Sequence, residues 1–255
     1  MAEPDARVRD VAVERVDGPA RREDRERVVV EAPLVLTARG TAVATIMRTP
    51  GHDLELARGL LHAESVAAAG LRQVDADTID ADVAAEAFAG RGLLSTAACG
   101  VCGRAAIADL ELRAREVTAD TTIAAGVLAA LPDALRGAQD VFAATGGLHA
   151  AGLFTTRGVL VAAREDIGRH NAVDKLVGWA LASHLDPATH VLFLSGRIGY
   201  ELVQKAIMFG VPLVAAVSAP SSLAIELAER FRIGLAGFVR GPRANLYAHA
   251  WRVER

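Results

Sequence analysis

Hydrophobic residues near the start of the chain recur with the two-residue spacing of strands. Residues 28–36 and 41–47 alternate apolar with polar side chains and are rich in β-branched residues, which is typical of strands. Arg39 and Gly40 lie between them and suit a tight turn. The pattern therefore predicts an early β-hairpin.

Helical spacing follows this hairpin. Asp53 is the predicted N-cap of a helix whose apolar positions fall on one face, namely Leu54, Ala57, Leu60 and Leu61. Residues 71–83 predict at best an edge strand, because aspartates interrupt them. Residues 121–131 predict a second amphipathic helix that ends at Pro132.

Strands and helices alternate in the second half of the chain. The expected strands cover residues 148–155, 158–163, 191–194, 212–217 and 235–239, and the expected helices cover residues 133–144, 171–184, 199–209 and 221–231. The first of these helices runs into Gly146, which suits a C-terminal cap. Regular alternation of apolar strands with helices predicts a mostly parallel sheet that is covered on both faces.

We therefore expect an α/β protein with two domains. Residues 1–27 are crowded with charged side chains and are predicted to form a disordered arm. Residues 28–130 are predicted to form a small mixed α+β domain, and residues 131–255 a three-layer αβα domain.

Composition narrows the class of protein. Of the 255 residues, 52% are hydrophobic and 23% charged, with a net charge of −3, which indicates a globular protein and disfavours nucleic acid as a partner. Two cysteines are too few for a disulfide-stapled secreted domain. No apolar run approaches the ~20 residues of a membrane-spanning helix. We expect a cytoplasmic protein that does not bind membranes.

Polar residues gather where the predicted strands of the second half end. These segments are Arg164–Asn171, Ser195-Gly196-Arg197, Ser218–Ser222 and Phe238–Arg243. The carboxyl ends of parallel strands form the usual ligand crevice of α/β sheets, and helix N-termini with arginines favour anions. The sequence thus predicts a pocket for a polyanion such as a nucleotide. The alternative is that these segments are ordinary helix starts and that Arg164, Glu165 and Asp166 pair with one another.

Both cysteines lie in one short segment, Cys99-Gly100-Val101-Cys102-Gly103. A structural zinc site needs two further ligands, and no histidine has finger-like spacing. A thioredoxin-like dithiol normally opens a helix, which the glycines disfavour. A sulfur carrier needs an accessible thiolate on an uncrowded loop, and the glycines suit this role. The residues alone leave open which cysteine carries the sulfur.

Several stretches resemble the formate dehydrogenase accessory sulfurtransferase family, FdhD. They are Met47–Asp53, Cys99–Gly103, Thr145–Ala151, Arg164–Lys175, Ser195–Arg197 and Ser218–Ser221, and they span the chain from about residue 30 onward. The resemblance implies a sulfurtransferase that accepts persulfide sulfur from a cysteine desulfurase. It then passes the sulfur to the bis-molybdopterin guanine dinucleotide molybdenum cofactor before insertion into formate dehydrogenase. An alternative is a non-catalytic chaperone of the same cofactor.

The resemblance also implies site residues. Cys99 maps to the persulfide carrier and Cys102 to its partner cysteine. The cofactor-binding residues are expected to be Phe238, Val239, Arg240, Gly241, Pro242 and Arg243, with Ser195, Gly196, Arg197, Ser218, Gly146, Gly147 and His149 from the neighbouring segments. The family implies a cytidine deaminase-like larger domain and a homodimer. The zinc signature of the deaminases is absent, so we expect no resident metal.

Overall fold

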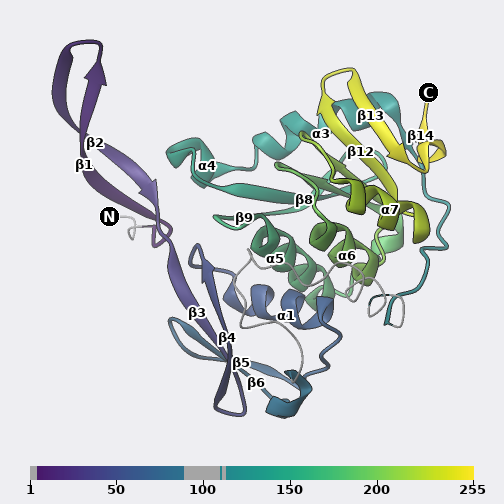
Figure 1. The fold of residues 1–255 in the computed structure, drawn as a ribbon, viewed down its shortest axis with the longest axis horizontal. Helices are drawn as coiled ribbons and strands as arrows, with labels where there is room; N and C mark the ends of the chain where they lie inside the picture. The colour runs from purple at the N-terminus through teal and green to yellow at the C-terminus, as the bar shows by residue number, and fades with distance from the viewer. Residues whose placement is uncertain (1–4, 89–109, 111–112) are drawn as a thin grey trace.

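The structure is a computed structural model that describes residues 5–88, 110 and 113–255. Its largest sheet has six strands in the order β13-β12-β11-β10-β8-β9 (Figure 1). They are β8 (His149–Thr155), β9 (Leu160–Asp166), β10 (His190–Leu194), β11 (Leu213–Ala216), β12 (Gly234–Arg240) and β13 (Arg243–Ala248). The central strands β10 and β11 are apolar and buried on both faces, because helices lie above and below them.

The prediction of a mostly parallel sheet is wrong. Only β10, β11 and β12 run parallel to one another, while β8, β9 and β13 are each antiparallel to a neighbour. The short turns 156–159 and 241–242 join successive strands directly and leave no room for a crossover helix, which a parallel connection requires. The fold is a mixed α/β fold, and β13 was not expected from the sequence.

Helices cover both faces of this sheet. On one face lie α5 (Arg169–Ala182), α6 (Tyr200–Phe209) and α7 (Ser222–Arg230), and on the other lies α3 (Ala125–Arg136) (Figure 1). Alternate strand residues point to the two cores: Leu192 packs with α5 and α6, whereas Phe193 packs with α3. No helix in the described part of the chain is long and apolar enough to cross a membrane.

Helix α3 does not stop at Pro132, contrary to prediction. It continues to Arg136, because its buried face, which includes Leu131 and Leu135, extends past the proline. Burial of such leucines contributes about 2 kcal/mol each, enough to offset the ~3 kcal/mol cost of an interior proline. The predicted helix 133–144 is therefore split into the end of α3 and the short α4 (Asp140–Thr145), which Gly146 caps in a left-handed conformation as expected.

The boundary predicted at residue 130 also falls too late. β7 (Ile123–Ala124) pairs with β14 (Val253–Glu254) near the end of the chain. Ile123 and Leu128 are buried in the core that α3 shares with the six-stranded sheet. Residues 123–130 therefore belong to the larger unit, because their apolar side chains pack there.

A second sheet has four strands in the order β4-β3-β6-β5. They are β3 (Ala32–Ala38), β4 (Thr41–Arg48), β5 (Leu71–Asp75) and β6 (Thr78–Ala81). Arg39 and Gly40 form the predicted turn with positive φ angles. The single edge strand predicted at 71–83 is instead a hairpin, and β6 lies inside the sheet. Asp80 is tolerated there because its carboxylate accepts hydrogen bonds from Thr37 and Gly40.

Helix α1 (Asp53–Ala63) joins the two sheets by packing against α5. Two glycines make the contact possible. A Cβ atom at Gly59 would lie 2.0 Å from the carbonyl oxygen of Asp174, and one at Gly178 would lie 1.9 Å from that of Glu55. The backbones of the two helices therefore touch directly, which only glycine allows at these positions.

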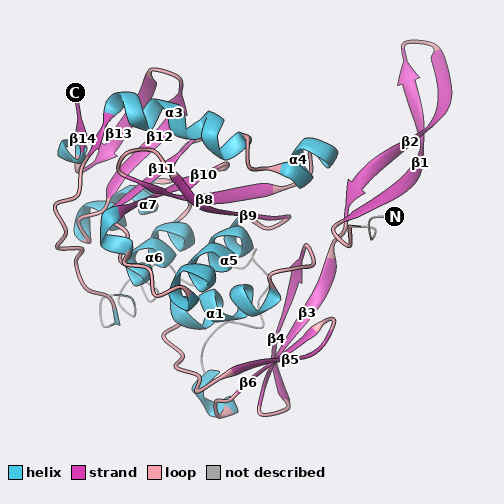
Figure 2. Cartoon of the chain, turned by 180° about the vertical axis from the view of Figure 1, so that it is seen from behind, coloured by secondary structure: helices cyan, strands magenta, loops and turns pink. Residues whose placement is uncertain are grey.

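The prediction of a disordered arm is wrong for most of that segment, because residues 8–29 form two strands. β1 (Val8–Asp17) and β2 (Ala20–Val29), with ten residues each, form an antiparallel hairpin that projects from the body (Figure 2). Gly18, with φ 56°, and Pro19 form its turn. Cross-strand ion pairs such as Arg15–Asp24, at 2.7 Å, organise the charges that a compositional argument assigns to disorder. We call this hairpin the arm.

Candidate functional site

The carboxyl ends of four strands meet at one edge of the six-stranded sheet, as the sequence predicts. β9, β10, β11 and β12 run toward this edge, and β8 runs away from it, so the residues at the start of β8 lie there too. The start of β8 and the loops at this edge contain Gly146, Gly147, His149, Ser195, Gly196, Arg197 and Ser218. We call these seven residues the sheet edge.

Hydrogen bonds fix the loops of the sheet edge relative to one another. Ser195 Oγ accepts from the backbone nitrogen of Ala150 at 2.8 Å, and the Ser195 nitrogen donates to Ala150 O at 3.0 Å. The next loop is attached by Phe238, whose nitrogen donates to Ser218 O at 3.1 Å. The Ser195 hydroxyl thus holds the start of β8, and with it His149, against β10.

His149 lies half-buried in positive surroundings. Its ring packs on Gly196, where a Cβ atom would lie 3.2 Å from His149 Nδ1. Burial lowers the pKa of His149, and the positive charges of Arg169 and Arg197 lower it further. The imidazole is therefore neutral at neutral pH and offers one donor and one acceptor beside two guanidinium groups.

Three helices begin at this edge. α5 follows Gly168 and α6 follows Gly199, both without a side-chain cap, and α7 follows Ser221, whose Oγ accepts from Ala224 N at 3.2 Å. Helix N-termini carry partial positive charge and backbone N–H groups without intrahelical partners. The arrangement favours a negatively charged ligand.

One carboxylate lies among these positive groups. Glu201, in the first turn of α6, forms an ion pair with His170 Nε2 at 2.7 Å, and this contact lowers the pKa of Glu201. Sequence reasoning missed Glu201 as a part of the site, whereas Arg169 lies in the segment Arg164–Asn171 that it expected there. The predicted start of α6 would have found Glu201, because this helix begins at the same edge of the sheet.

The segment Phe238–Arg243 is the tip of a hairpin rather than the loop that the sequence predicts, because β12 continues to Arg240 and β13 begins at Arg243. Phe238 is 37% exposed and has a φ of 51°, which is unfavourable for a bulky residue. The Arg240 guanidinium lies 5.9 Å from its ring centre. Arg240 and Arg243 face each other across Gly241 and Pro242, and only Val239 of this segment is buried. The tip therefore presents a ring and two cations to solvent.

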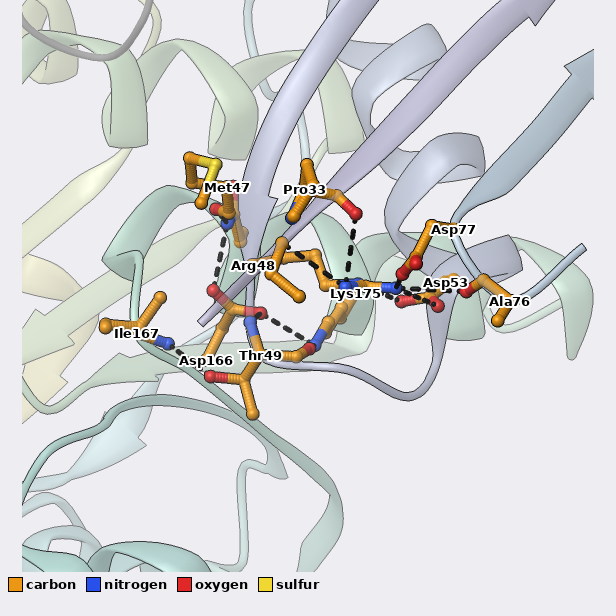
Figure 3. Close-up of polar contacts among 12 residues, drawn as sticks. Pro33, Met47, Arg48, Thr49, Asp53, Ala76, Asp77, Asp166, Ile167 and Lys175 are labelled. Carbon is orange, nitrogen blue, oxygen red and sulfur yellow. Dashed lines mark hydrogen bonds and ion pairs between the residues drawn. The ribbon is translucent and has the colours of Figure 1, made fainter. Parts of the chain in front are cut away.

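Asp166, which lies in the segment expected to line the pocket, is instead part of a buried polar network. Asp166 is fully buried and pairs with Lys175 Nζ at 2.7 Å, while Thr49 N donates to the same carboxylate at 3.1 Å (Figure 3). Lys175 Nζ also donates to Thr49 O at 2.8 Å, and Asn171 Nδ2 donates to Asp166 Oδ1 at 2.9 Å. This buried network fastens the small sheet to α5.

A second set of polar contacts near the junction between the small sheet and the helices centres on Arg48. Its guanidinium binds both carboxylate oxygens of Asp53 at 3.0 Å and reaches Asp77 at 2.9 Å (Figure 3). The prediction that Asp53 caps α1 is therefore wrong. His52 occupies the cap position, and the Asp53 side chain is engaged by Arg48 instead.

Arg164 and Glu165 do not pair with each other or with Asp166, contrary to the structural alternative raised above. Arg164 binds both oxygens of Glu55 on α1, at 2.6 and 2.8 Å. Glu165 accepts from the backbone nitrogens of Val141 and Phe142 at the start of α4. Both residues therefore hold helices that flank the sheet edge.

Cys99 and Cys102 lie outside the described residues, so the structure does not relate them to the sheet edge. The described geometry defines the class of protein as a mixed α/β protein in which His149, Arg197 and the starts of three helices lie at one edge of the main sheet.

Comparisons with known proteins agree on one family. The model of the FdhD/NarQ family matches residues 29–254, and the chain belongs to this family. A sulfur carrier protein FdhD from Nocardia farcinica is 44% identical, with 93% of this chain and 91% of that protein covered. The corresponding protein from Sulfolobus acidocaldarius is 40% identical, with 97% and 99% covered. The crystal structure of a candidate formate dehydrogenase accessory protein from Desulfotalea psychrophila shares the fold, with a TM-score of 0.80 at 21% identity over 96% of this chain and 99% of that one.

Proposed function

We propose that this protein is a sulfur carrier that serves the maturation of formate dehydrogenase. The observation that supports this most is the near full-length similarity to proteins named sulfur carrier protein FdhD, in a chain that has its only two cysteines in one Cys-x-x-Cys segment. The sulfur donor in this proposal is a cysteine desulfurase. The acceptor is the molybdenum of a bis-molybdopterin guanine dinucleotide cofactor, bound as cargo in the cytoplasm.

Loading is a thiol exchange at sulfur. The Cys99 thiolate attacks the terminal sulfur of the donor persulfide, the donor S–S bond breaks, and the donor cysteine leaves as a thiolate. In the second step the S–S bond of the Cys99 persulfide breaks and Cys99 leaves as a thiolate. The terminal sulfur goes to the reduced metal, which supplies the two electrons that convert sulfane sulfur to sulfide. Cys102 resolves or shields the loaded sulfur.

The sheet edge and the hairpin tip are the proposed binding surface for the cofactor. Arg197 and the starts of α5 and α6 are suited to the diphosphates, because N–H groups and guanidinium donors both favour phosphate oxygens. Phe238, with Arg240 beside it, offers an exposed ring for stacking on a guanine or pterin. A homodimer with one such surface per subunit would match a cofactor that carries two guanine nucleotides. A cytidine deaminase-like larger domain is part of the same proposal.

The test is to load the protein with sulfur and to measure the added sulfur by mass spectrometry. The protein is incubated with a cysteine desulfurase and cysteine, and bound sulfane sulfur is measured for the wild type, Cys99→Ala and Cys102→Ala. Loss of the added sulfur in Cys99→Ala alone supports the proposal. A stable persulfide on Cys99→Ala but not on Cys102→Ala would reverse the assignment. Full formate dehydrogenase activity with both cysteines replaced would favour the non-catalytic chaperone.

A further inference from the structure

Glu201 carries a charge opposite to that of the cations around it at the sheet edge. Its side chain is 52% exposed at the start of α6. The contact with His170 lowers its pKa most, and the positive charges of Lys205 and Arg169 lower it further, so the carboxylate is ionised at neutral pH. A negative charge at this position weakens the binding of any anion there. Its presence among the cations therefore needs a reason other than phosphate binding.

Neutralisation of Lys205 is not that reason. Lys205 lies one helical turn after Glu201 on α6, and its Nζ binds both carboxylate oxygens of Asp174, at 2.7 and 2.9 Å. Asp174 is buried and the Lys205 side chain is only 11% exposed, so this ion pair fastens α6 to α5 from within. The charge of Lys205 thus has its own counter-ion, and Glu201 extends toward the sheet edge instead.

His170 holds the Glu201 carboxylate in one orientation. His170 lies one turn before Asp174 on α5, and its Nε2 is 2.7 Å from Oε2 of Glu201. The imidazole is only 13% exposed, so its position between the two helix starts is well defined. An ionised carboxylate has two oxygens with about four acceptor positions. Contact with one nitrogen therefore leaves acceptor capacity on the exposed side of Glu201.

The acceptors of a carboxylate distinguish the nucleobases from one another. Guanine carries two adjacent donors on its Watson–Crick edge, N1–H and the 2-amino group, and their spacing matches the two oxygens of a carboxylate. Adenine and cytosine place a ring-nitrogen acceptor beside their amino group, and this lone pair is repelled by a carboxylate. Uracil offers a single N–H between two carbonyl oxygens. A carboxylate that is fixed at a nucleotide site thus favours guanine and disfavours the other bases.

We propose that Glu201 selects a guanine base at the sheet edge, by accepting hydrogen bonds from N1–H and the 2-amino group, and that His170 is its positioning residue. The inference rests on the proposed function, which brings a nucleotide to this edge with its phosphates at Arg197 and the helix starts. The two sets of charges then have separate tasks. The cations favour the phosphates of any nucleotide, and the carboxylate determines which base is bound.

Calorimetric titration of the full chain with GDP, inosine diphosphate and ADP tests this assignment. The wild type should bind inosine diphosphate about tenfold more weakly than GDP, because the inosine base lacks the 2-amino group. Glu201→Gln keeps the size of the side chain but exchanges one acceptor oxygen for a donor. It should weaken GDP binding at least about tenfold and leave ADP binding unchanged or tighter, because a negative charge near the phosphates is removed.

Glu226→Gln is the matched control. It removes the same charge from an exposed position in the middle of α7, and it should leave the affinity for all three nucleotides within about twofold of the wild type. If Glu201→Gln instead changes GDP and ADP binding by the same factor, Glu201 acts only through its charge and the proposal is overturned. A wild type without a preference for GDP over ADP overturns it as well.

Substitution of His170 tests the positioning role. His170→Leu removes the nitrogen that contacts Glu201 and should lower the preference for GDP over ADP at least about threefold, whereas His170→Gln retains a donor and should restore most of it. Equal preference in the two variants would remove His170 from the proposal. Sulfur loading is measured on the same preparations. A wild type that loads sulfur without preferring GDP overturns this inference and leaves the carrier role standing, and one that prefers GDP but never loads sulfur has the opposite meaning.

Discussion

Removal of the charge of Asp166 should destabilise the whole protein. Asp166 is fully buried and accepts hydrogen bonds from Thr49 N at 3.1 Å and Gly168 N at 2.9 Å, in addition to its ion pair with Lys175. Asp166→Asn keeps the shape of the side chain but removes the negative charge that pairs with the ammonium of Lys175, itself 1% exposed. A buried charge that loses its counter-ion typically costs about 3–5 kcal/mol.

The assay is urea unfolding followed by circular dichroism, with the double variant Asp166→Asn/Lys175→Met as the matched control. In a chain of this length, 3 kcal/mol corresponds to a fall in Tm of roughly 6–12 °C. The double variant should be more stable than Asp166→Asn, because methionine removes the uncompensated charge while filling similar volume. A loss below about 1 kcal/mol for the single variant, or a double variant that is less stable, would refute the buried ion pair as the fastening between the two sheets.

Three further changes test other parts of the structure. Burial would raise the pKa of Glu55, but its hydrogen bond with Arg164 lowers it to about 2, so this carboxylate should stabilise the fold above pH 4.5 and lose that effect toward pH 2. Thermal unfolding across that range should show a smaller drop for Glu55→Gln than for the wild type. Gly178→Ala should cost at least about 3 kcal/mol by denaturant titration, because its Cβ would meet backbone, whereas Gly126→Ala has open space and should be neutral or mildly stabilising. Gly196→Ala should displace the imidazole that packs on it and weaken binding of GDP by about fivefold in calorimetry with little change in Tm; unchanged affinity would remove that ring from the binding surface.

The periodicity of the sequence was enough to place most helices and strands, because apolar faces decide where those elements pack. It predicted the hairpin around Arg39 and Gly40, but it overestimated how much of the six-stranded sheet is parallel, because it did not show that a turn joins β12 to a further strand. It also failed for the arm, since strands held by cross-strand charge pairs such as Arg15–Asp24 have the composition of a disordered segment.

The positions of the candidate site residues could likewise be predicted only in part. The principle that strand ends form a ligand crevice correctly brought Ser195, Arg197 and Ser218 to one edge, whereas His149 was expected there only from the family resemblance. The charged run after β9 was expected at the same site, but its aspartate is buried in the junction between the sheets. The sequence position of Asp166 does not show whether its carboxylate binds a ligand or pairs with a lysine. Its partner in the structure, Lys175, was not predicted to interact with it.

The direct backbone contact between α1 and α5 bears on how the molecule responds to a ligand. Two helices that meet without intervening side chains have little freedom to slide or tilt, so both sheets should behave as one rigid frame. A pair of fluorophores, one on the four-stranded sheet and one on the six-stranded sheet, should then report the same energy-transfer efficiency before and after nucleotide addition. Any conformational change on ligand binding would then be confined to segments outside the two sheets and the helices α1 and α5.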